Sequence, residues 1–256
     1  MVSLYFYTMI RRLIVLCCLM LYSCIVVADG EVRRDTLSLF DRSRSRLIPV
    51  EYSLPASGIR LNGVVVFSHG YNQNQPGSYL DYTWLKKYLT DRGYAIVSIQ
   101  HELPDDSLLS KELPAKVTRW SNWKRGEANI LYVIEHMVEV HQALQRKKYI
   151  MMGHSNGGDM SALFATDYPQ YCERLITLDN RRMTLPVQKK FGVASIRSSD
   201  QPADEGVIPD ELTQRKYHMQ IIKATGVIHN HMGDSGDSGE RAEMMRLMDQ
   251  ILKSHE

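Results

Sequence analysis

A serine flanked by glycines stands at residues 153–157, in the sequence Gly-His-Ser-Asn-Gly. An apolar run, 149–152, precedes it, and a small-residue helical pattern, 159–165, follows it. Together these runs predict a strand, a sharp turn and a helix, with the hydroxyl of Ser155 exposed at the apex. The flanking glycines leave out Cβ atoms that would clash in so tight a bend. Ser155 is therefore the candidate nucleophile, with a mere helix-capping role as the alternative.

A serine hydroxyl is a poor nucleophile unless a general base lies within hydrogen-bond reach. Two histidines, His229 and His231, follow the apolar segment 221–228 near the end of the chain. Either imidazole could take the proton from Ser155, and the residues alone leave both open. His154, inside the turn, and His69, in an early loop, are interpreted as packing and loop-shaping residues.

The base in turn needs a carboxylate that fixes its tautomer. Asp200 is the preferred candidate because it follows the predicted strand 193–196 closely enough to be held rigidly. Asp204 lies farther along, beyond a proline, although a turn there could bring it back. Asp179, at the end of the predicted strand 174–179, is the third possibility.

The elements that must position these residues alternate along the chain. Residues 36–55 alternate apolar and polar side chains on either side of a charged turn at 41–44, which predicts two antiparallel strands. Further strands are expected at 64–67, 95–99, 149–152, 174–179, 193–196 and 218–224, and helices at 79–92, 127–147, after Ser155 and at 237–255. This order predicts an α/β fold with a mostly parallel sheet. Sites in such sheets form at the carboxyl ends of the strands, where Ser155 and the other candidates stand.

The connections between these elements bear on access to the site. The long polar connection 101–126 contains Trp120 and Trp123, and we expect it to roof part of the site, with the tryptophans covering core. The short link 180–192 leaves little room for a lid domain. Arg181 and Arg182 open that link and could recognise an anionic group, although ion pairing with a nearby acid is the simpler account.

Composition and charge limit the classes of function that the chain can have. The chain has 256 residues and 44% hydrophobic content, which suits one globular domain with a sizeable core. Residues 1–28 hold two arginines and no acidic residue, so the remainder carries 29 basic and 29 acidic residues. Without a basic excess, no nucleic-acid partner is expected. The pattern His229-x-His231 with Asp234 lacks a further ligand pair, so neither a metal nor another cofactor is expected.

The first residues are typical of a targeting segment. Arg11 and Arg12 precede an apolar run, 13–28, that ends in Val-Val-Ala. We expect a cleaved signal peptide at 1–28 and a domain at 29–256, which implies a secreted or periplasmic protein. The run is shorter than the ~20 residues that span a bilayer. An uncleaved membrane anchor and a lipidated Cys24 remain the alternatives.

The order Ser, acid, His, on strands that alternate with helices, resembles the α/β-hydrolase superfamily over residues 36–254. The opening segment 41–50 resembles dienelactone-hydrolase-like and platelet-activating-factor-acetylhydrolase-like members. The resemblance implies helices on both faces of the sheet, and the short link 180–192 argues against a large lid domain. It also implies an oxyanion hole formed by the main-chain N–H groups of Asn156 and of Tyr71, which stands in a His-Gly-Tyr loop. Members carry the base just after the last strand, and His-Asn-His-Met at 229–232 is similar to their His-Asn-Asp-Met, which favours His229.

The resemblance implies a serine hydrolase that cleaves an ester or similar acyl bond of a small molecule, without a cofactor. An acyltransferase, in which an alcohol or amine replaces water, is the enzymatic alternative. A catalytically inactive member that serves as a binding protein is the alternative from another class. The substrate itself is not encoded in any motif of the chain.

Overall fold

The computed structural model describes residues 33–253. The expected signal peptide at 1–28 lies outside these residues. Within the described part of the chain, no helix has the length and apolarity that crossing a membrane requires.

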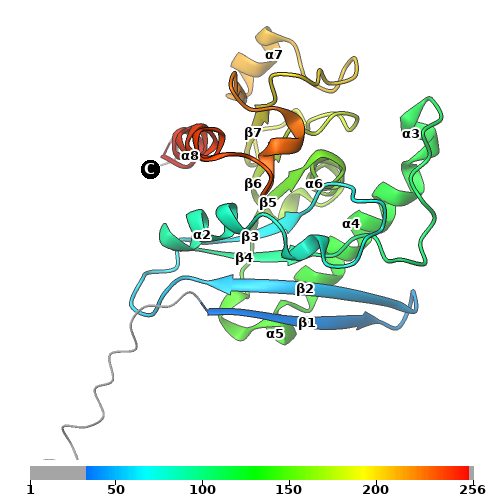
Figure 1. The fold of residues 1–256 in the computed structure, drawn as a ribbon, viewed down its shortest axis with the longest axis vertical. Coiled ribbons are helices and arrows are strands. Elements are labelled where there is room, and N and C mark those ends of the chain that lie inside the picture. The colour runs from blue at the N-terminus through cyan, green and yellow to red at the C-terminus, as the bar shows by residue number, and fades with distance from the viewer. Residues whose placement is uncertain (1–32, 254–256) are drawn as a thin grey trace, which may run out of the picture. The chain divides into compact units, whose positions relative to one another are not determined.

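Eight strands form one sheet in the order β1-β2-β4-β3-β5-β6-β7-β8 (Figure 1). Their bounds are β1 Arg33–Asp41, β2 Arg46–Leu54, β3 Gly63–Ser68, β4 Tyr94–Ile99, β5 Tyr149–His154, β6 Cys172–Leu178, β7 Gly192–Arg197 and β8 Gln220–Lys223. β1 pairs antiparallel with β2, and β2 antiparallel with β4, whereas the pairs from β4 through to β8 are parallel. The predicted mostly parallel sheet with an opening antiparallel pair is confirmed.

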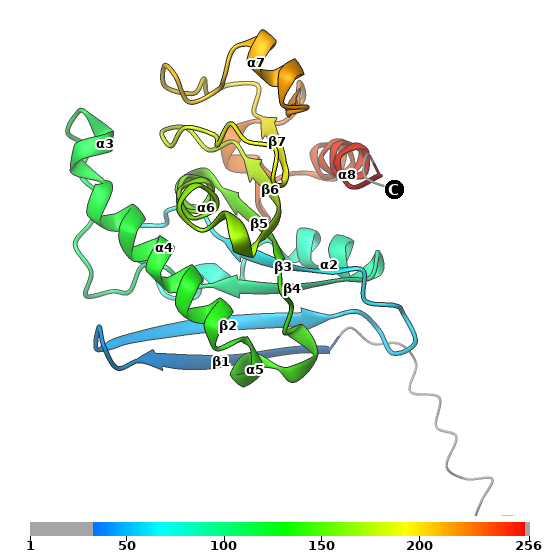
Figure 2. The same cartoon turned by 180° about the vertical axis from the view of Figure 1, so that it is seen from behind.

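Helices cover both faces of this sheet. The helices are α2 Thr83–Asp91, α3 Ala115–Thr118, α4 Trp120–Glu135, α5 Met137–Val140, α6 Ser155–Asp167, α7 Glu211–Lys216 and α8 Ser238–Lys253. Short 3-10 turns are η2 Ser78–Leu80, η3 Gln142–Leu144, η4 Pro169–Tyr171 and η5 His229–Met232. α4 and α6 pack on one face and α2 and α8 on the other (Figure 2). The link between β6 and β7, residues 179–191, contains no helix or strand that would form a lid.

The central strands explain why the sequence shows uninterrupted apolar runs. In β3, Val64 and Val66 join the core on the α4 and α6 side, whereas Val65 and Phe67 join the core beneath α2 and α8. Successive side chains of a strand point to opposite faces, so a strand covered on both faces must be apolar at every position.

Two helix starts differ from the expectation. The helix expected at 79–92 begins only at Thr83, because Tyr82 adopts a left-handed conformation with φ 62° that interrupts the helix. The carboxylate of Asp234, from a distant loop, accepts hydrogen bonds from the N–H and hydroxyl of Thr83, each at 3.0 Å, and so caps α2. α4 begins at Trp120, within the polar connection 101–126 and before the expected start at 127. Its first turns pack closely on α6: a Cβ on Gly126 would lie 2.1 Å from the sulfur of Met160.

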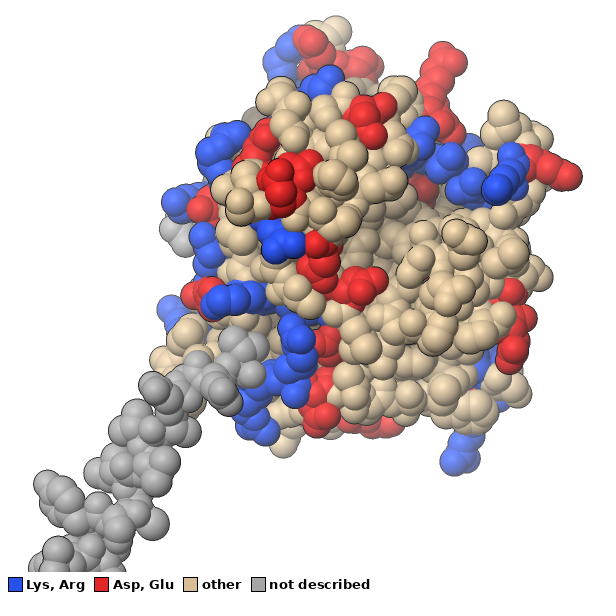
Figure 3. All heavy atoms as spheres, viewed as in Figure 1, with Lys and Arg blue, Asp and Glu red and all other residues tan. Residues whose placement is uncertain are grey.

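The ends of other elements agree with the sequence signals. Asp237 accepts the N–H of Glu240 at 2.9 Å, and the Glu240 carboxylate accepts the N–H of Asp237 at 2.9 Å, which is the capping box that an aspartate followed three residues later by a glutamate indicates in the sequence. Trp123 is fully buried, as expected of a core residue, whereas Trp120 is 47% exposed. On the face shown in Figure 3, acidic and basic side chains are interspersed, in keeping with the balanced charge of the domain.

Candidate active site

Ser155 stands at the junction of β5 and α6 with a left-handed φ of 52°. A Cβ on Gly153 would lie 2.4 Å from the carbonyl oxygen of Gly157, and one on Gly157 would lie 2.2 Å from that of Ser68. Any side chain at either position would displace backbone. Both glycines are therefore needed for the tight turn that presents the hydroxyl, as the sequence pattern predicted.

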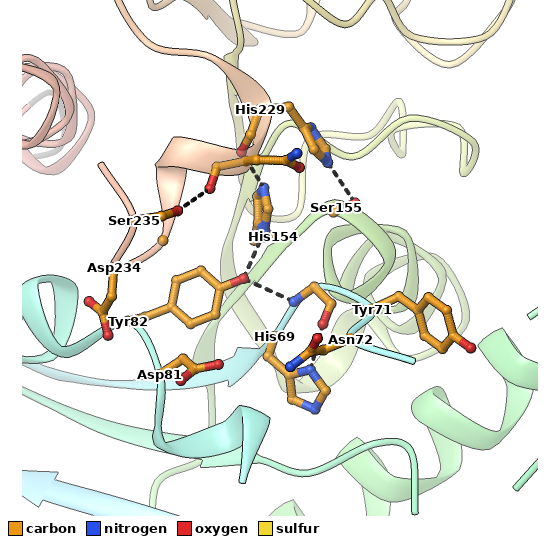
Figure 4. A pocket seen from close by; sticks show the side chains of 13 residues that line it. His69, Tyr71, Asn72, Asp81, Tyr82, His154, Ser155, His229, Asp234 and Ser235 are labelled. Atoms are coloured by element: carbon orange, nitrogen blue, oxygen red, sulfur yellow. Dashed lines mark hydrogen bonds between the residues drawn. The ribbon is translucent and has the colours of Figure 1, made fainter. Parts of the chain in front are cut away.

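His229, the first residue of η5, contacts this hydroxyl (Figure 4). Its Nε2 lies 2.9 Å from Oγ of Ser155, and its Nδ1 lies 2.6 Å from Oδ2 of Asp179. His231 faces elsewhere, with its Nδ1 2.8 Å from a carboxylate oxygen of Glu240. Of the two histidines left open by the sequence, the structure brings His229 to the serine.

Asp179 directly follows β6 and is fully buried, with a left-handed φ of 55°. Its carboxylate accepts the hydroxyl of Ser198 at 2.6 Å and pairs with the guanidinium of Arg197 at 2.8 Å. Burial alone would raise the pKa of Asp179, but the hydrogen bond from His229, the charge of Arg197 and the bonds from Ser198 hold it below its ordinary value. An ionised carboxylate can only accept, so His229 Nδ1 carries the proton and Nε2 is left to accept the hydroxyl of Ser155.

The structure corrects the expected partner of the imidazole, which was Asp200. The carboxylate of Asp200 accepts the main-chain N–H of His229 at 2.7 Å, so it holds the loop and not the ring. Asp204 is held apart by the hydrogen bond from its N–H to the carbonyl of Arg181, and it makes no hydrogen bond to His229. The reason is the strand order: β6 adjoins β5, which ends at Ser155, whereas β7 lies one strand farther away. The signal in the sequence was the aspartate that immediately ends the buried run 174–178.

The loop after β3 is His69-Gly70-Tyr71, as the resemblance implied. His69 Nε2 accepts the N–H of His101 at 3.2 Å, so its proton is on Nδ1, which donates to the carbonyl of Gly70 at 2.7 Å. That carbonyl belongs to the same peptide group as the N–H of Tyr71. His69 therefore fixes the plane of this peptide, consistent with its expected loop-shaping role.

Asn156 is the second residue of α6, where main-chain N–H groups have no carbonyl one turn back. Its side chain points into the protein: Oδ1 accepts the indole N–H of Trp123 at 2.9 Å, and Nδ2 donates to Glu102 at 3.1 Å and Asn122 at 2.9 Å. The amide is fully satisfied there. Asn156 can therefore offer only its main-chain N–H at the elbow.

A pocket of about 410 Å³ opens beside Ser155 and His229 (Figure 4). Its lining comes from the loop 69–72, from Asp81 and Tyr82, from the elbow and from residues 229–235. Apart from histidine, the only charged side chains in this lining are Asp81 and Asp234. Tyr71 and Tyr82 line it together with asparagine, serine and histidine side chains, so polar and apolar groups contribute about equally to its surface.

The structure differs from the expectations for the segments around the pocket. The connection 101–119 does not line the pocket, although the N–H of Leu109 donates to the hydroxyl of Tyr71 at 3.0 Å and so anchors the loop. Arg181 donates to the carbonyl of Pro202 and the amide of Gln201, and neither Arg181 nor Arg182 lines the pocket. The arginine that pairs with Asp179 at this end of the sheet is Arg197. Among residues 33–253, no group of three or more acidic, histidine or cysteine side chains is arranged to hold a metal ion.

Comparisons with known proteins agree on the architecture. A hyperthermophilic esterase from Pyrobaculum calidifontis superposes with a TM-score of 0.58 at 16% identity, over 89% of this chain and 85% of that one. Dienelactone hydrolase from Anabaena variabilis gives 0.57 at 13% identity, over 86% and 96% of the two chains. An alpha-beta serine hydrolase homologue from Coxiella burnetii gives 0.53 at 18% identity, over 85% and 97%. At these identities the likeness establishes a shared fold.

The comparison with curated proteins found no match. The sequence of residues 63–196, from β3 to β7, matches the family described as alpha/beta hydrolase fold. This segment is more than half of the chain and includes the elbow, Asp179 and the loop after β3. The chain therefore belongs to the alpha/beta hydrolase fold family.

Proposed function

We propose that the protein is a serine hydrolase that cleaves an ester or similar acyl bond of a small molecule. The observation that carries this proposal is the continuous hydrogen-bonded series Ser155, His229 and Asp179 beside a pocket. A partly accessible serine, an imidazole and a buried carboxylate in this order form the arrangement that activates a hydroxyl for acyl transfer.

The proposed reaction has two halves. Oγ of Ser155 attacks the carbonyl carbon while Nε2 of His229 takes its proton, and ionised Asp179 stabilises the imidazolium. The main-chain N–H groups of Tyr71 and Asn156 stabilise the oxyanion, a contribution worth roughly 3–4 kcal/mol per donor. The imidazolium then protonates the leaving alcohol. Water attacks the acyl-enzyme with His229 again as base, which releases the acid and restores the serine.

Transfer of the acyl group to an alcohol or amine would use the same residues, so an acyltransferase is the alternative reaction. Asn72, Asn230 and Ser235 line the pocket and can hydrogen-bond a water molecule, which supports water as the acceptor. The esterase and dienelactone hydrolase neighbours point in the same direction. Product analysis with added alcohols separates the two reactions: a hydrolase releases mainly free acid.

A fluorophosphonate probe tests the proposal and separates it from an inactive binding protein. The probe should label the purified protein stoichiometrically, and peptide mapping should place the adduct on Ser155. His229→Ala should slow labelling by several orders of magnitude, because the hydroxyl is then not activated. Full-length folded protein that remains unlabelled would refute the proposal.

We also propose, from the sequence alone, that residues 1–28 direct secretion and are removed. Mass analysis of the exported protein should find Asp29 at the amino terminus. A chain that begins at Met1 would indicate an uncleaved anchor, and a lipid on Cys24 would indicate a lipoprotein.

A further inference from the structure

Tyr82 adopts a conformation that its residue type seldom takes. Its φ of 62° and ψ of 40° are left-handed, a region in which bulky side chains are outliers. Its ring is buried and packs edge-on against Phe67, with 4.7 Å between the ring centroids. Its hydroxyl accepts the main-chain N–H of Gly70 at 3.1 Å. Backbone strain of this kind persists where the surrounding structure holds a residue in place, and here it holds a hydroxyl against the loop after β3.

The hydroxyl of Tyr82 also contacts His154, the residue before the serine (Figure 4). Nδ1 of His154 lies 2.8 Å from that hydroxyl, and Nε2 lies 3.1 Å from the main-chain carbonyl oxygen of His229. Burial and the neighbouring His229 ring lower the pKa of His154 to about 3. The imidazole is therefore neutral and holds a single proton.

The donor and the acceptor of each hydrogen bond in this series can be assigned by starting from the carbonyl of His229. The carbonyl of His229 can only accept, so the single proton of His154 is on Nε2. Nδ1 must then accept, which makes Tyr82 the donor to it. The oxygen of Tyr82 is left to accept from Gly70, whose N–H can only donate. Each buried group is satisfied, and the series runs in one direction from Gly70 through Tyr82 and His154 to His229.

Gly70 packs closely against both side chains of this series. A Cβ on Gly70 would lie 2.8 Å from Nδ1 of His154 and 3.2 Å from the hydroxyl of Tyr82. The loop after β3 therefore approaches the two side chains as closely as its backbone allows. The residue next to Gly70 is Tyr71, whose N–H is the proposed oxyanion donor.

We propose that Tyr82 and His154 are positioning residues that fix the loop bearing the Tyr71 N–H relative to the loop bearing the base, His229. This inference rests on the proposed function. The transition state needs the oxyanion donor and the base in place at once, and a misplacement of about 1 Å can cost roughly 100-fold in rate. Neither side chain is the proposed nucleophile, base or oxyanion donor. Substitution of either residue should therefore lower kcat and leave the binding of the substrate in its ground state largely unchanged.

The test compares Tyr82→Phe, which removes one oxygen, with His154→Gln, which keeps a donor near Nε2 but loses the acceptor at Nδ1. Active sites are first counted with a fluorophosphonate, and kcat is expressed per labelled site. Each variant should lower kcat per site by about 10–100-fold and change KM by less than about threefold. The double variant should be little worse than either single one, because both break the same series.

Tyr88→Phe is the matched control. Tyr88 is a buried tyrosine of α2 whose hydroxyl donates to Asp249 at 2.6 Å, and neither residue lines the pocket. It should lower stability as Tyr82→Phe does while leaving kcat per site unchanged. A purely structural role for Tyr82 and His154 would reduce the number of titratable sites and leave kcat per site within about twofold of wild type, which overturns the inference. A wild type that neither labels nor hydrolyses esters refutes the proposed function itself.

Discussion

Two aspartates contact His229 at different atoms, and this separates two tasks at the scale of single residues. Asp179 accepts from the ring nitrogen Nδ1, and Asp200 accepts from the main-chain N–H. Only the contact with the ring determines which nitrogen of His229 carries the proton. The contact with the main chain determines where the loop lies.

Asp179→Asn should therefore lower kcat by about 10⁴-fold, because an amide no longer enforces the productive tautomer. Asp200→Asn keeps an oxygen that can accept the same N–H, so its kcat should fall by less than about tenfold. Steady-state kinetics on the two folded variants decide between them. A loss of kcat in Asp200→Asn that exceeds the loss in Asp179→Asn would mean that Asp200, and not Asp179, fixes the tautomer of His229.

A second prediction concerns the pH dependence of stability through His154. The folded protein keeps His154 neutral to about pH 3, whereas the unfolded chain binds a proton near the ordinary pKa of 6.5. The unfolded state then holds more protons between these values, so the free energy of unfolding rises with pH in this window, by up to about 1.4 kcal/mol per pH unit.

His154→Gln cannot bind this proton, so its free energy of unfolding should depend less steeply on pH. Urea denaturation of both proteins between about pH 4 and pH 6 measures the two slopes. His69, Asp179 and His229, the titratable groups near His154, are present in both proteins, so their contributions largely cancel in the comparison. Parallel slopes would mean that His154 is not held neutral.

Sequence reasoning selected Ser155 and His229, which the structure brings into contact, because each has a local signature. Ser155 has its glycines, and His229 has the apolar run before it and the similarity of residues 229–232 to family members. The acid has no comparable signature: three aspartates follow predicted strands, and proximity along the chain favoured the wrong one as the partner of the ring. The hydrogen-bonded series through Tyr82 was not predictable, because it depends on a left-handed backbone conformation at Tyr82 that the neighbouring residue types do not indicate.

At the scale of the elements, the turn between β5 and α6 depends on the absence of a Cβ at Gly157. Gly157→Ala would bring that atom within 2.2 Å of the carbonyl oxygen of Ser68, which is held in the central strand β3. The free energy of unfolding should fall by about 3 kcal/mol or more, because backbone must move.

Gly239→Ala is the control for this substitution, since its Cβ would meet nothing closer than 3.3 Å at the start of α8. It should change the free energy of unfolding by less than about 1 kcal/mol. Chemical denaturation of both variants measures the difference. A Gly157→Ala protein as stable as the control would show that the turn is not as tight as described.

The elements differ in how well the sequence predicted them. Buried strands such as β3 were evident from apolar runs, and the start of α8 from its capping box. α2 started late because its cap, Asp234, comes from far along the chain and leaves no local signal. The first turns of α4 were missed because their packing on α6 depends on Gly126, a residue that usually disfavours helix.

At the scale of the whole molecule, the pocket has a negative charge at Asp81 and Asp234 and no lysine or arginine in its lining. Asp234 is already committed to capping α2, whereas Asp81 makes no side-chain hydrogen bond among residues 33–253. Burial and the charge of Asp234 raise the pKa of Asp81. The balanced charge of the domain gave no hint of this local excess, since it depends on which loops meet at the pocket.

An ester with a carboxylate in its acyl chain should therefore have a higher KM than a neutral ester of the same length, by about tenfold for one repulsive charge. Asp81→Asn should narrow this gap and leave the neutral ester unaffected. Initial rates with the matched pair of esters measure it. Equal KM values for the two esters in wild type would show that the side of the pocket formed by Asp81 does not face the acyl chain of the substrate.

The parallel strands bring Ser155, Asp179 and His229 together from three separate connections, and the proposal that they act as one unit has a direct test. The measurement is kcat for an activated ester with wild type and with Ser155→Ala, both confirmed to be folded. Loss of the nucleophile should lower kcat by about 10⁶-fold, leaving only the residual rate that the oxyanion hole and substrate binding supply. A Ser155→Ala protein that keeps the wild-type rate would contradict the account.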